Sequence, residues 1–293
     1  MASGVEALTG RSRARIGAAV LAVPLLAALW GFWIEPASLR DEAYRLSVAG
    51  WPSACDGLRI AVLADLHVGS PHNGLPKLER VVDLTLAAEP DLILLAGDYV
   101  IHGVAGGRFV PPESAARVLA RLRAPGGVYA VLGNHDWWLD GPRVSTALEG
   151  VSIRVLEDRA VRVSSGRCEL WLAGIGDYTE ALHDVERALS DVPPDAPVVA
   201  FTHDPDVFPE IPARVRLTIA GHTHGGQVRL PGIGRPIVPS RYGERYAAGH
   251  VVEGGRHLFV STGLGTSILP VRFGVPPEIS LLDVGAEPTD RAP

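Results

Sequence analysis

Residues 58–67 read LRIAVLADLH, an apolar run that ends in an aspartate and a histidine two positions apart. A short, mostly apolar run of this kind is typical of a strand that is buried on both faces of a sheet. Extended backbone would direct the side chains of Asp65 and His67 to the same side of that strand. The stretch therefore predicts a buried strand that delivers two metal-binding side chains at its end.

Four more apolar runs along the chain end in short polar motifs of the same kind. These are Gly97-Asp98, Gly133-Asn134-His135-Asp136, Thr202-His203-Asp204 and Gly221-His222-Thr223-His224. The ends of neighbouring strands in open α/β sheets are where ligands bind, so we expect the motifs to meet at one site. Their carboxylates, amide oxygen and imidazoles suit two first-row divalent cations. The motifs thus predict a two-metal phosphoester hydrolase.

Seven side chains are the expected metal ligands, and Asp98 is expected to bridge both ions through its two oxygens. The seven are Asp65, His67, Asp98, Asn134, His203, His222 and His224. A hydroxide bridging the two metals would be the nucleophile, while the metals neutralise the phosphoryl oxygens. His135 is a catalytic candidate that would protonate the leaving alkoxide or stabilise the transition state. Asp136 would assist by fixing the tautomer of His135.

Strand-like and helix-like segments alternate along the rest of the chain. Helical spacing or composition is found at residues 75–88, 113–122, 144–148 and 180–189. Further strands are expected at residues 91–96, 127–132, 151–155, 160–163, 169–173, 197–202, 215–220, 227–230, 258–261 and 278–282. This order predicts an α/β fold in which two mixed sheets pack as a sandwich with helices outside.

The N-terminal region is different in character. Residues 16–34 (IGAAVLAVPLLAALWGFWI) carry no charge and, as a helix, would span about 28 Å, close to the thickness of a bilayer core. We interpret them as an uncleaved transmembrane anchor; a cleaved signal peptide and a buried helix are the alternatives. Arg11, Arg13 and Arg15 before the span favour a cytoplasmic N-terminus and an extracytoplasmic catalytic domain, with the cytoplasmic face as the other option.

These assignments divide the chain into five parts. They are a basic segment (1–15), the anchor (16–34), a connector (35–56), the expected catalytic domain (57–284) and a C-terminal tail (285–293). The formal net charge of -6 argues against nucleic acid as a partner, because binding to the phosphate backbone normally needs a basic face.

Several other residues leave alternatives open. Cys55 and Cys168 lack metal-type spacing, and we interpret them as two buried thiols; a disulfide would require an oxidising compartment. Trp137 and Trp138 are either core residues or an apolar wall for a base or acyl chain. Three arginines could bind a second phosphate but are expected to be solvated charges. They are Arg235, Arg241 and Arg245.

Taken in this order, the five motifs resemble those of the calcineurin-like metallophosphoesterase superfamily over residues 58–283. The resemblance implies a four-layer α/β/β/α fold and a catalytic role for His135. It assigns Asp65, His67, Asp98 and His224 to one metal. It assigns Asp98, Asn134, His203 and His222 to the other.

Residues 221–227 (GHTHGGQ) and 263–282 resemble a bacterial, membrane-anchored branch of that superfamily, which includes hydrolases of UDP-2,3-diacylglucosamine. We therefore expect a phosphodiester or pyrophosphate hydrolase that acts at the membrane surface, with a lipid-linked substrate as a candidate. A phosphodiesterase or nuclease for soluble substrates and a non-catalytic binding scaffold are the alternatives. Manganese is the favoured metal; iron, zinc and cobalt also suit the ligands.

Overall fold

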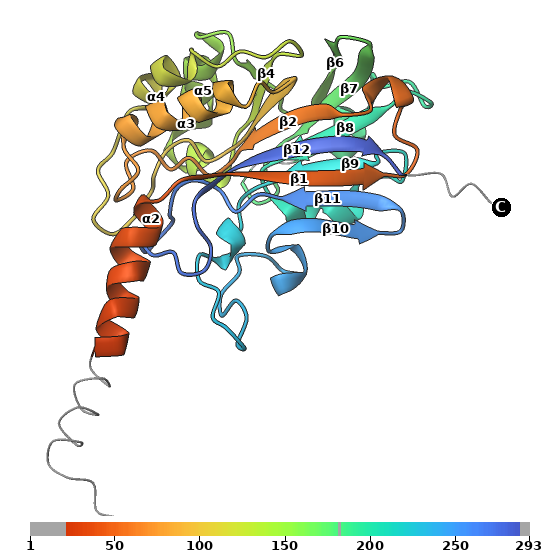
Figure 1. The fold of residues 1–293 in the computed structure, drawn as a ribbon. Helices are drawn as coiled ribbons and strands as arrows, with labels where there is room; N and C mark the ends of the chain where they lie inside the picture. The colour runs from red at the N-terminus through yellow and green to blue at the C-terminus, as the bar shows by residue number, and fades with distance from the viewer. Residues whose placement is uncertain (1–21, 181–182, 288–293) are drawn as a thin grey trace, which may run out of the picture.

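Two six-stranded sheets lie face to face in the computed structural model, which describes residues 22–180 and 183–287 (Figure 1). The first sheet has the order β1 (Arg40–Val48), β12 (Glu278–Ala286), β2 (Leu58–Leu63), β3 (Leu92–Ala96), β4 (Val128–Val131) and β5 (Arg154–Val155). The second has the order β10 (Gly249–Glu253), β11 (Arg256–Val260), β9 (Leu217–Ala220), β8 (Val198–Thr202), β7 (Cys168–Ile175) and β6 (Arg159–Ser165).

Both sheets are mixed, and each has a parallel centre. Strands β2 to β5 run parallel in the first sheet, and β7, β8, β9 and β11 run parallel in the second. Antiparallel strands are added at β12, β6 and β10. Parallel pairing brings the carboxyl ends of successive strands to one edge, so the loops that follow them gather at one end of the sandwich.

Apolar side chains fill the space between the two sheets. Ile60 and Leu94 from the first sheet and Phe201 and Ile219 from the second are fully buried in this layer. A second apolar layer lies between the first sheet and three helices, α3 (Leu75–Ala87), α4 (Pro112–Leu119) and α5 (Asn134–Glu149). The outer face of the second sheet is covered by shorter pieces, α6 (Val185–Ala188), η3 (Pro205–Glu210) and η5 (Gly243–Tyr246). The predicted sandwich of two mixed sheets with flanking helices is confirmed.

Local differences from the sequence expectations concern edge strands and loops. Residues 35–56, interpreted as a connector, contain β1, which pairs in parallel with β12. Only Leu46 and Val48 of this edge strand are buried, so its sequence lacks the apolar run of a central strand. The expected strand at 227–230 is wrong: only single bridges form there. Strand β10, another half-exposed edge strand, was not expected.

The observed helices differ from the expected ones mainly in length. The short helix expected at residues 144–148 is the end of α5, which begins at Asn134 and bends at Asp140. The helix expected at 180–189 is reduced to the four residues of α6, and residues 181–182 lie outside the described part of the chain.

The N-terminal helix extends away from the body of the molecule (Figure 1). Residues 22–29 are helical and continue through η1 (Trp30–Ile34) and α2 (Glu35–Ala37). The expected basic segment 1–15 and residues 16–21 of the expected anchor lie outside the described residues, as does the tail beyond residue 287. Within residues 22–180 and 183–287, no helix is long and apolar enough to cross a membrane.

The two cysteines form a disulfide, which corrects the interpretation of two buried thiols. The bond joins Cys55, in the short helix η2 (Ser53–Cys55), to Cys168 at the start of β7, and both residues are buried between the sheets. Because η2 lies between β1 and β2, the bond ties the first sheet to the second.

Candidate metal centre

All seven expected ligands lie together at the end of the sandwich where the parallel strands finish. Asp65 and His67 follow β2, Asp98 follows β3, and Asn134 begins the helix after β4. His203 follows β8, and His222 and His224 follow β9. Six of these side chains are buried, and His222 is partly exposed. Residues separated by up to 159 positions along the chain are thus brought to one point by the sheet topology.

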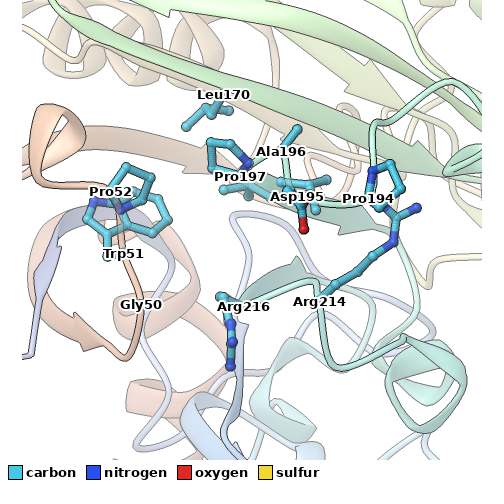
Figure 2. Close-up of a pocket in the computed structure, with 12 residues that line it drawn as sticks. Gly50, Trp51, Pro52, Leu170, Pro194, Asp195, Ala196, Pro197, Arg214 and Arg216 are labelled. Atoms are coloured by element: carbon cyan, nitrogen blue, oxygen red, sulfur yellow. The ribbon is translucent and has the colours of Figure 1, made fainter.

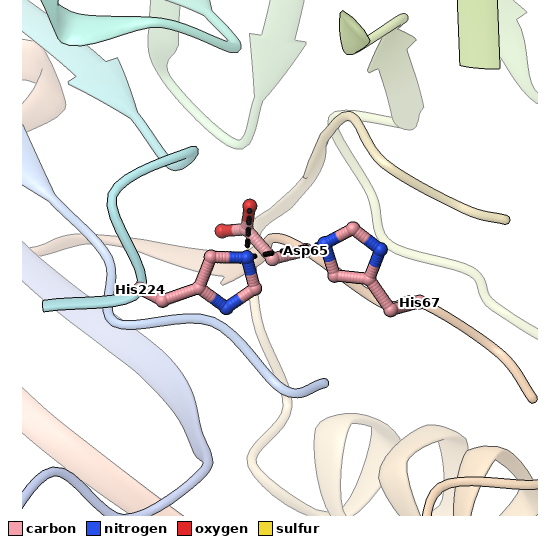
Figure 3. A group of neighbouring side chains, drawn as sticks. All are labelled: Asp65, His67 and His224. Carbon is pink, nitrogen blue, oxygen red and sulfur yellow. Dashed lines mark hydrogen bonds and ion pairs between the residues drawn. The ribbon is translucent and has the colours of Figure 1, made fainter. Parts of the chain in front are cut away.

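Asp65, His67 and His224 form the first group of converging donor atoms (Figure 3). The Nε2 atoms of His67 and His224 are 3.1 Å apart. His224 Nε2 also lies 3.5 Å from Asp65 Oδ1. Three ligand atoms at this spacing, drawn from two sheets, define a pocket large enough for a single ion.

His203, His222 and Asn134 form the second group. Asn134 Oδ1 lies 3.2 Å from His203 Nε2 and 3.1 Å from His222 Nδ1. Asp98 Oδ2 lies between the groups, 3.3 Å from His67 Nε2 and 3.4 Å from His203 Nε2. One carboxylate is therefore within reach of both groups.

The chemistry of these donors fits cations. Backbone carbonyls of Val100 and Ala96 accept the Nδ1–H of His67 and His203, at 3.1 and 2.8 Å, so the Nε2 lone pairs of both rings face the centre. Burial lowers the pKa of His67 to about 3, which keeps its imidazole neutral. Burial alone would raise the pKa of Asp98 and lower that of His203. Their mutual attraction instead holds the pKa of Asp98 well below its usual value and raises the pKa of His203 well above its own. Buried donor atoms that converge in this way repel one another unless a proton or a cation lies among them.

Left-handed backbone carries most of these ligands. Five have positive φ angles between 36° and 69°: Asp65, His67, Asp98, His222 and His224. We expected Asp65 and His67 to share a side through extended backbone, and this reason is wrong. They converge because tight turns aim them inward. Non-glycine residues in this region cost about 1–3 kcal/mol each and cluster at functional sites.

Two glycines allow the loops to approach closely enough for the ligands to meet. A Cβ on Gly97, which has a φ of 86°, would lie 2.6 Å from His203 Nδ1. A Cβ on Gly133 would lie 2.3 Å from Asp98 Oδ1. Any side chain at either position would displace a ligand, which explains why glycine precedes both Asp98 and Asn134.

His135 lies beside the first group, and its partners differ from those expected. Its ring centroid is 4.6 Å from that of His67, and its Nε2 is 3.4 Å from Ser267 Oγ. His135 Nδ1 is buried and has no hydrogen-bond partner among the residues that the structure describes. Burial lowers the pKa of this imidazole.

The Asp136 carboxylate makes no hydrogen bond to the His135 ring, so its expected role in fixing the tautomer is corrected. Its carboxylate accepts the backbone N–H groups of Asp98 at 2.8 Å, Tyr99 at 2.9 Å and Gly133 at 2.9 Å. Asp136 therefore ties the loop that carries Asp98 to the loop that carries Asn134. The adjacent position in sequence was misleading because neighbouring helical residues point in different directions.

Sequence reasoning missed Arg272, which is fully buried behind His224. Its Nη2 lies 3.4 Å from His224 Nδ1, and its guanidinium donates to the carbonyls of Gly265, Thr262 and Val275. No local pattern marks this arginine. Asp204, although part of a quoted motif, was also given no role; its Oδ2 lies 3.9 Å from His222 Nε2.

The structure separates the two tryptophans whose roles the sequence left open, and it pairs two of the three arginines with carboxylates. Trp137 is partly buried against the helix layer, whereas Trp138 is 46% exposed with its ring centroid 4.6 Å from that of His135. Arg241 and Arg245 form ion pairs with Asp206 and Glu253.

A separate cleft of about 480 Å³ lies at the opposite end of the strands (Figure 2). Trp51, Pro197, Arg214 and Arg216 are among its lining residues, and none of the expected site residues lines it. The Arg214 guanidinium already donates to three backbone carbonyls. We therefore place the chemistry at the converging ligands and not in this cleft.

Comparison with known proteins agrees with this placement. A family model described as calcineurin-like phosphoesterase matches residues 58–226, which include every expected ligand. Phosphodiesterase YaeI of Escherichia coli is 30% identical over 83% of this chain and 88% of its own length. An uncharacterized metallophosphoesterase of Bacillus subtilis, YkuE, is 29% identical over 85% of this chain and 86% of its own length.

A third relative is named for a lipid substrate. The UDP-2,3-diacylglucosamine pyrophosphatase LpxG of Chlamydia trachomatis is 25% identical over 92% of this chain and 96% of its own length.

Proposed function

Since the chain belongs to the calcineurin-like phosphoesterase family and is a metal-dependent phosphoester hydrolase, we propose that it holds two divalent ions and cleaves a phosphodiester or pyrophosphate at a membrane surface. The observation that carries the proposal is the position of Asp98 Oδ2, which lies 3.3 Å from a donor of one group and 3.4 Å from a donor of the other. A carboxylate shared in this way suits a pair of ions better than one.

Each group would hold one ion. Asp65, His67 and His224 would bind the first, and Asn134, His203 and His222 the second, with Asp98 between them. Two bound ions would activate water for attack and neutralise the charge of the phosphoryl oxygens. Manganese is the first metal to test, and iron, zinc and cobalt also suit these mixed nitrogen and oxygen donors.

His135 would act on the leaving group. It lies next to the first group, and its Nδ1 is buried without a hydrogen-bond partner among the described residues. An imidazole held close to the reacting phosphate can donate a proton to the departing oxygen. Ser267, 3.4 Å from Nε2, would orient the ring. Asp136 would act indirectly, by holding the Asp98 loop in place.

Action at a membrane is supported by the N-terminal helix. Its apolar side chains are exposed on all sides: Val23 67%, Leu25 71%, Leu26 62%, Leu29 46%, Trp30 45%, Phe32 37%, Trp33 59% and Ile34 46%. A helix that is apolar all round is stable in a bilayer and unfavourable in water. We propose that residues 16–34 anchor the chain and that its substrate is lipid-linked, as the name of LpxG suggests for that relative.

An extracytoplasmic position of the catalytic domain is supported by the buried disulfide, because such bonds persist in oxidising compartments. The three arginines before residue 16 favour the same orientation. A reporter fused after Pro293 tests this proposal: activity of a periplasmic reporter is expected, and activity of a cytoplasmic one would contradict it.

The bridging role of Asp98 is tested by Asp98→Asn. The neutral amide offers one oxygen in place of two, so metal content and hydrolysis of bis-p-nitrophenyl phosphate should fall together. Asp83→Asn is the matched control, because Asp83 lies on the exposed face of α3 in an ion pair with Arg121. Two ions per chain with full turnover in Asp98→Asn would exclude the bridge. Wild-type protein that binds no transition metal and hydrolyses no phosphoester would contradict the proposed function.

A further inference from the structure

Five large apolar side chains are exposed on three segments, each of which contacts a residue at or next to the metal centre, and we call them the apolar rim. They are Trp138 (46% exposed), Ile233 (72%), Ile237 (77%), Ile268 (72%) and Leu269 (51%). Single exposed apolar residues are ordinary, but a group gathered at a functional site marks a surface that contacts something apolar.

One side of the rim is fixed to the proposed catalytic histidine. Ser267, which precedes Ile268 and Leu269, has its Oγ 3.4 Å from His135 Nε2. Gln227 secures this segment, because its Oε1 accepts the N–H of Ser267 at 2.7 Å and its Nε2 donates to the Ser267 carbonyl at 3.1 Å. Ile268 and Leu269 are thus held at the mouth of the metal centre.

The other side of the rim is the loop of residues 228–243, which carries Ile233 and Ile237. Arg235 Nε donates to the carbonyl of Gly225 at 2.8 Å, directly after the ligand His224. A Cβ on Gly226 would lie 2.6 Å from the carbonyl oxygen of Ile237, so the loop rests on this glycine. The loop contains three arginines and no acidic residue.

The rim is joined to the apolar N-terminal helix by a rigid connection. The Arg272 N–H donates to the Gly31 carbonyl at 2.9 Å. The Glu35 carboxylate accepts the N–H groups of Gly274 at 3.0 Å and Val275 at 2.6 Å. The segment that carries Ile268 and Leu269 therefore continues into the base of the helix. In Figure 1 the helix and the loop of residues 228–243 both project toward the lower side of the view.

From these contacts we propose that the apolar rim enters the interface of the bilayer that holds the helix, and that it receives the acyl chains of an amphipathic phosphoester. This inference rests on the proposed function and names its substrate class. A lipid surface is the occupant that the observations favour, because a folded protein seated on the rim would block access to the metal ligands. The exposed Arg229 of the loop matches anionic headgroups, and the loop's isoleucines match the acyl region.

The position of the rim is tested in the full-length protein without reference to activity. Ile237→Cys and Leu269→Cys each add one free thiol, since both natural cysteines are bonded, and a nitroxide is attached to it. Val252→Cys is the matched control, an exposed apolar residue (54%) on edge strand β10. In phosphatidylcholine–phosphatidylglycerol vesicles, labels at 237 and 269 should collide more with oxygen than with a water-soluble nickel chelate. The label at 252 should collide more with the nickel chelate than with oxygen. Water-like collisions at 237 and 269 would overturn the proposal.

Substrate handling is tested with two chromogenic probes that release the same p-nitrophenolate. One is soluble bis-p-nitrophenyl phosphate, and the other is a diacylglycerol p-nitrophenyl phosphodiester in the same vesicles. For Ile237→Ser with Leu269→Ser, the ratio of lipid-probe to soluble-probe turnover should fall roughly tenfold or more, because two large apolar contacts with the acyl region are lost. Val252→Ser should leave the ratio unchanged.

The outcomes separate the two proposals. An unchanged ratio in the double variant would overturn the role of the rim in receiving acyl chains. Lipid-buried labels at positions 237 and 269, together with a wild-type protein that hydrolyses neither probe, would refute the proposed function while supporting the rim as a membrane-binding surface.

Discussion

Removal of the Cys55–Cys168 disulfide should strongly destabilise the folded domain. The bond closes a loop with a sequence separation of 113 residues. The loop-closure entropy of a bridge of this span corresponds to about 5 kcal/mol at 25 °C, which the unfolded chain regains when the bond is absent. Because the bond ties η2 to β7, its loss also removes the covalent link between the two sheets.

The double variant Cys55→Ala with Cys168→Ala should therefore unfold at a lower urea concentration than the oxidised wild type. With an m value of about 3 kcal/mol/M, a loss of about 5 kcal/mol moves the midpoint by roughly 1.7 M. Fluorescence of the buried Trp51, together with circular dichroism, follows the transition. Dithiothreitol should shift the wild type in the same direction and leave the double variant unaffected, which serves as the control.

Two results would refute this reasoning. Titration of unreduced, urea-unfolded wild type with Ellman's reagent should detect no thiol, and two thiols per chain would mean that the bond does not form. If the bond forms but the double variant unfolds at the same urea concentration as the wild type, the loop-closure argument fails.

Substitutions at three further residues test other parts of the structure. Asp136→Ala leaves three buried backbone N–H groups without an acceptor, so it should lower the free energy of unfolding, measured with urea, by about 3–6 kcal/mol and should also lower the metal content. Asp136→Asn should have a smaller effect. An alanine variant as stable as the wild type would contradict the role of Asp136 in holding the two loops together. His135→Ala should keep its metal, measured by mass spectrometry, and lose turnover by roughly 10²–10⁴-fold, and normal turnover would exclude proton donation. Burial lowers the pKa of Lys77 from 10.5 to about 7, so the unfolded chain binds an extra proton between these values and the free energy of unfolding should rise with pH across this window. Urea midpoints at pH 7 and pH 10 should show this rise in the wild type and a smaller one in Lys77→Met; equal slopes would contradict it.

The expected ligands could be named before the structure because their signal is local. Each apolar run that forms a central strand ends at the residue that faces the site, as at Asp65 after β2 and Asp98 after β3. Parallel strands then bring these ends together, a consequence of topology that the alternation of strands and helices already indicates. The interpretation of residues 58–67 thus required only a short window of sequence.

The contacts that the sequence did not predict link segments that lie far apart in the chain. The pairing of Cys55 with Cys168, the position of Arg272 behind His224 and the pairing of β1 with β12 depend on how the two sheets pack. An edge strand such as β1 buries few side chains, so its sequence carries little periodic signal.

The sequence alone determined which residues converge at the candidate metal centre, because hydrophobic periodicity and strand-end motifs are properties of neighbouring residues. Only the tertiary structure decided how those residues are held. In the folded chain the Asp136 carboxylate bonds to the Asp98 loop and not to His135. Five of the expected ligands lie on left-handed backbone. The apolar helix is joined to the segment beside the expected metal ligands. Such contacts arise from the packing of distant segments, and no local pattern records them.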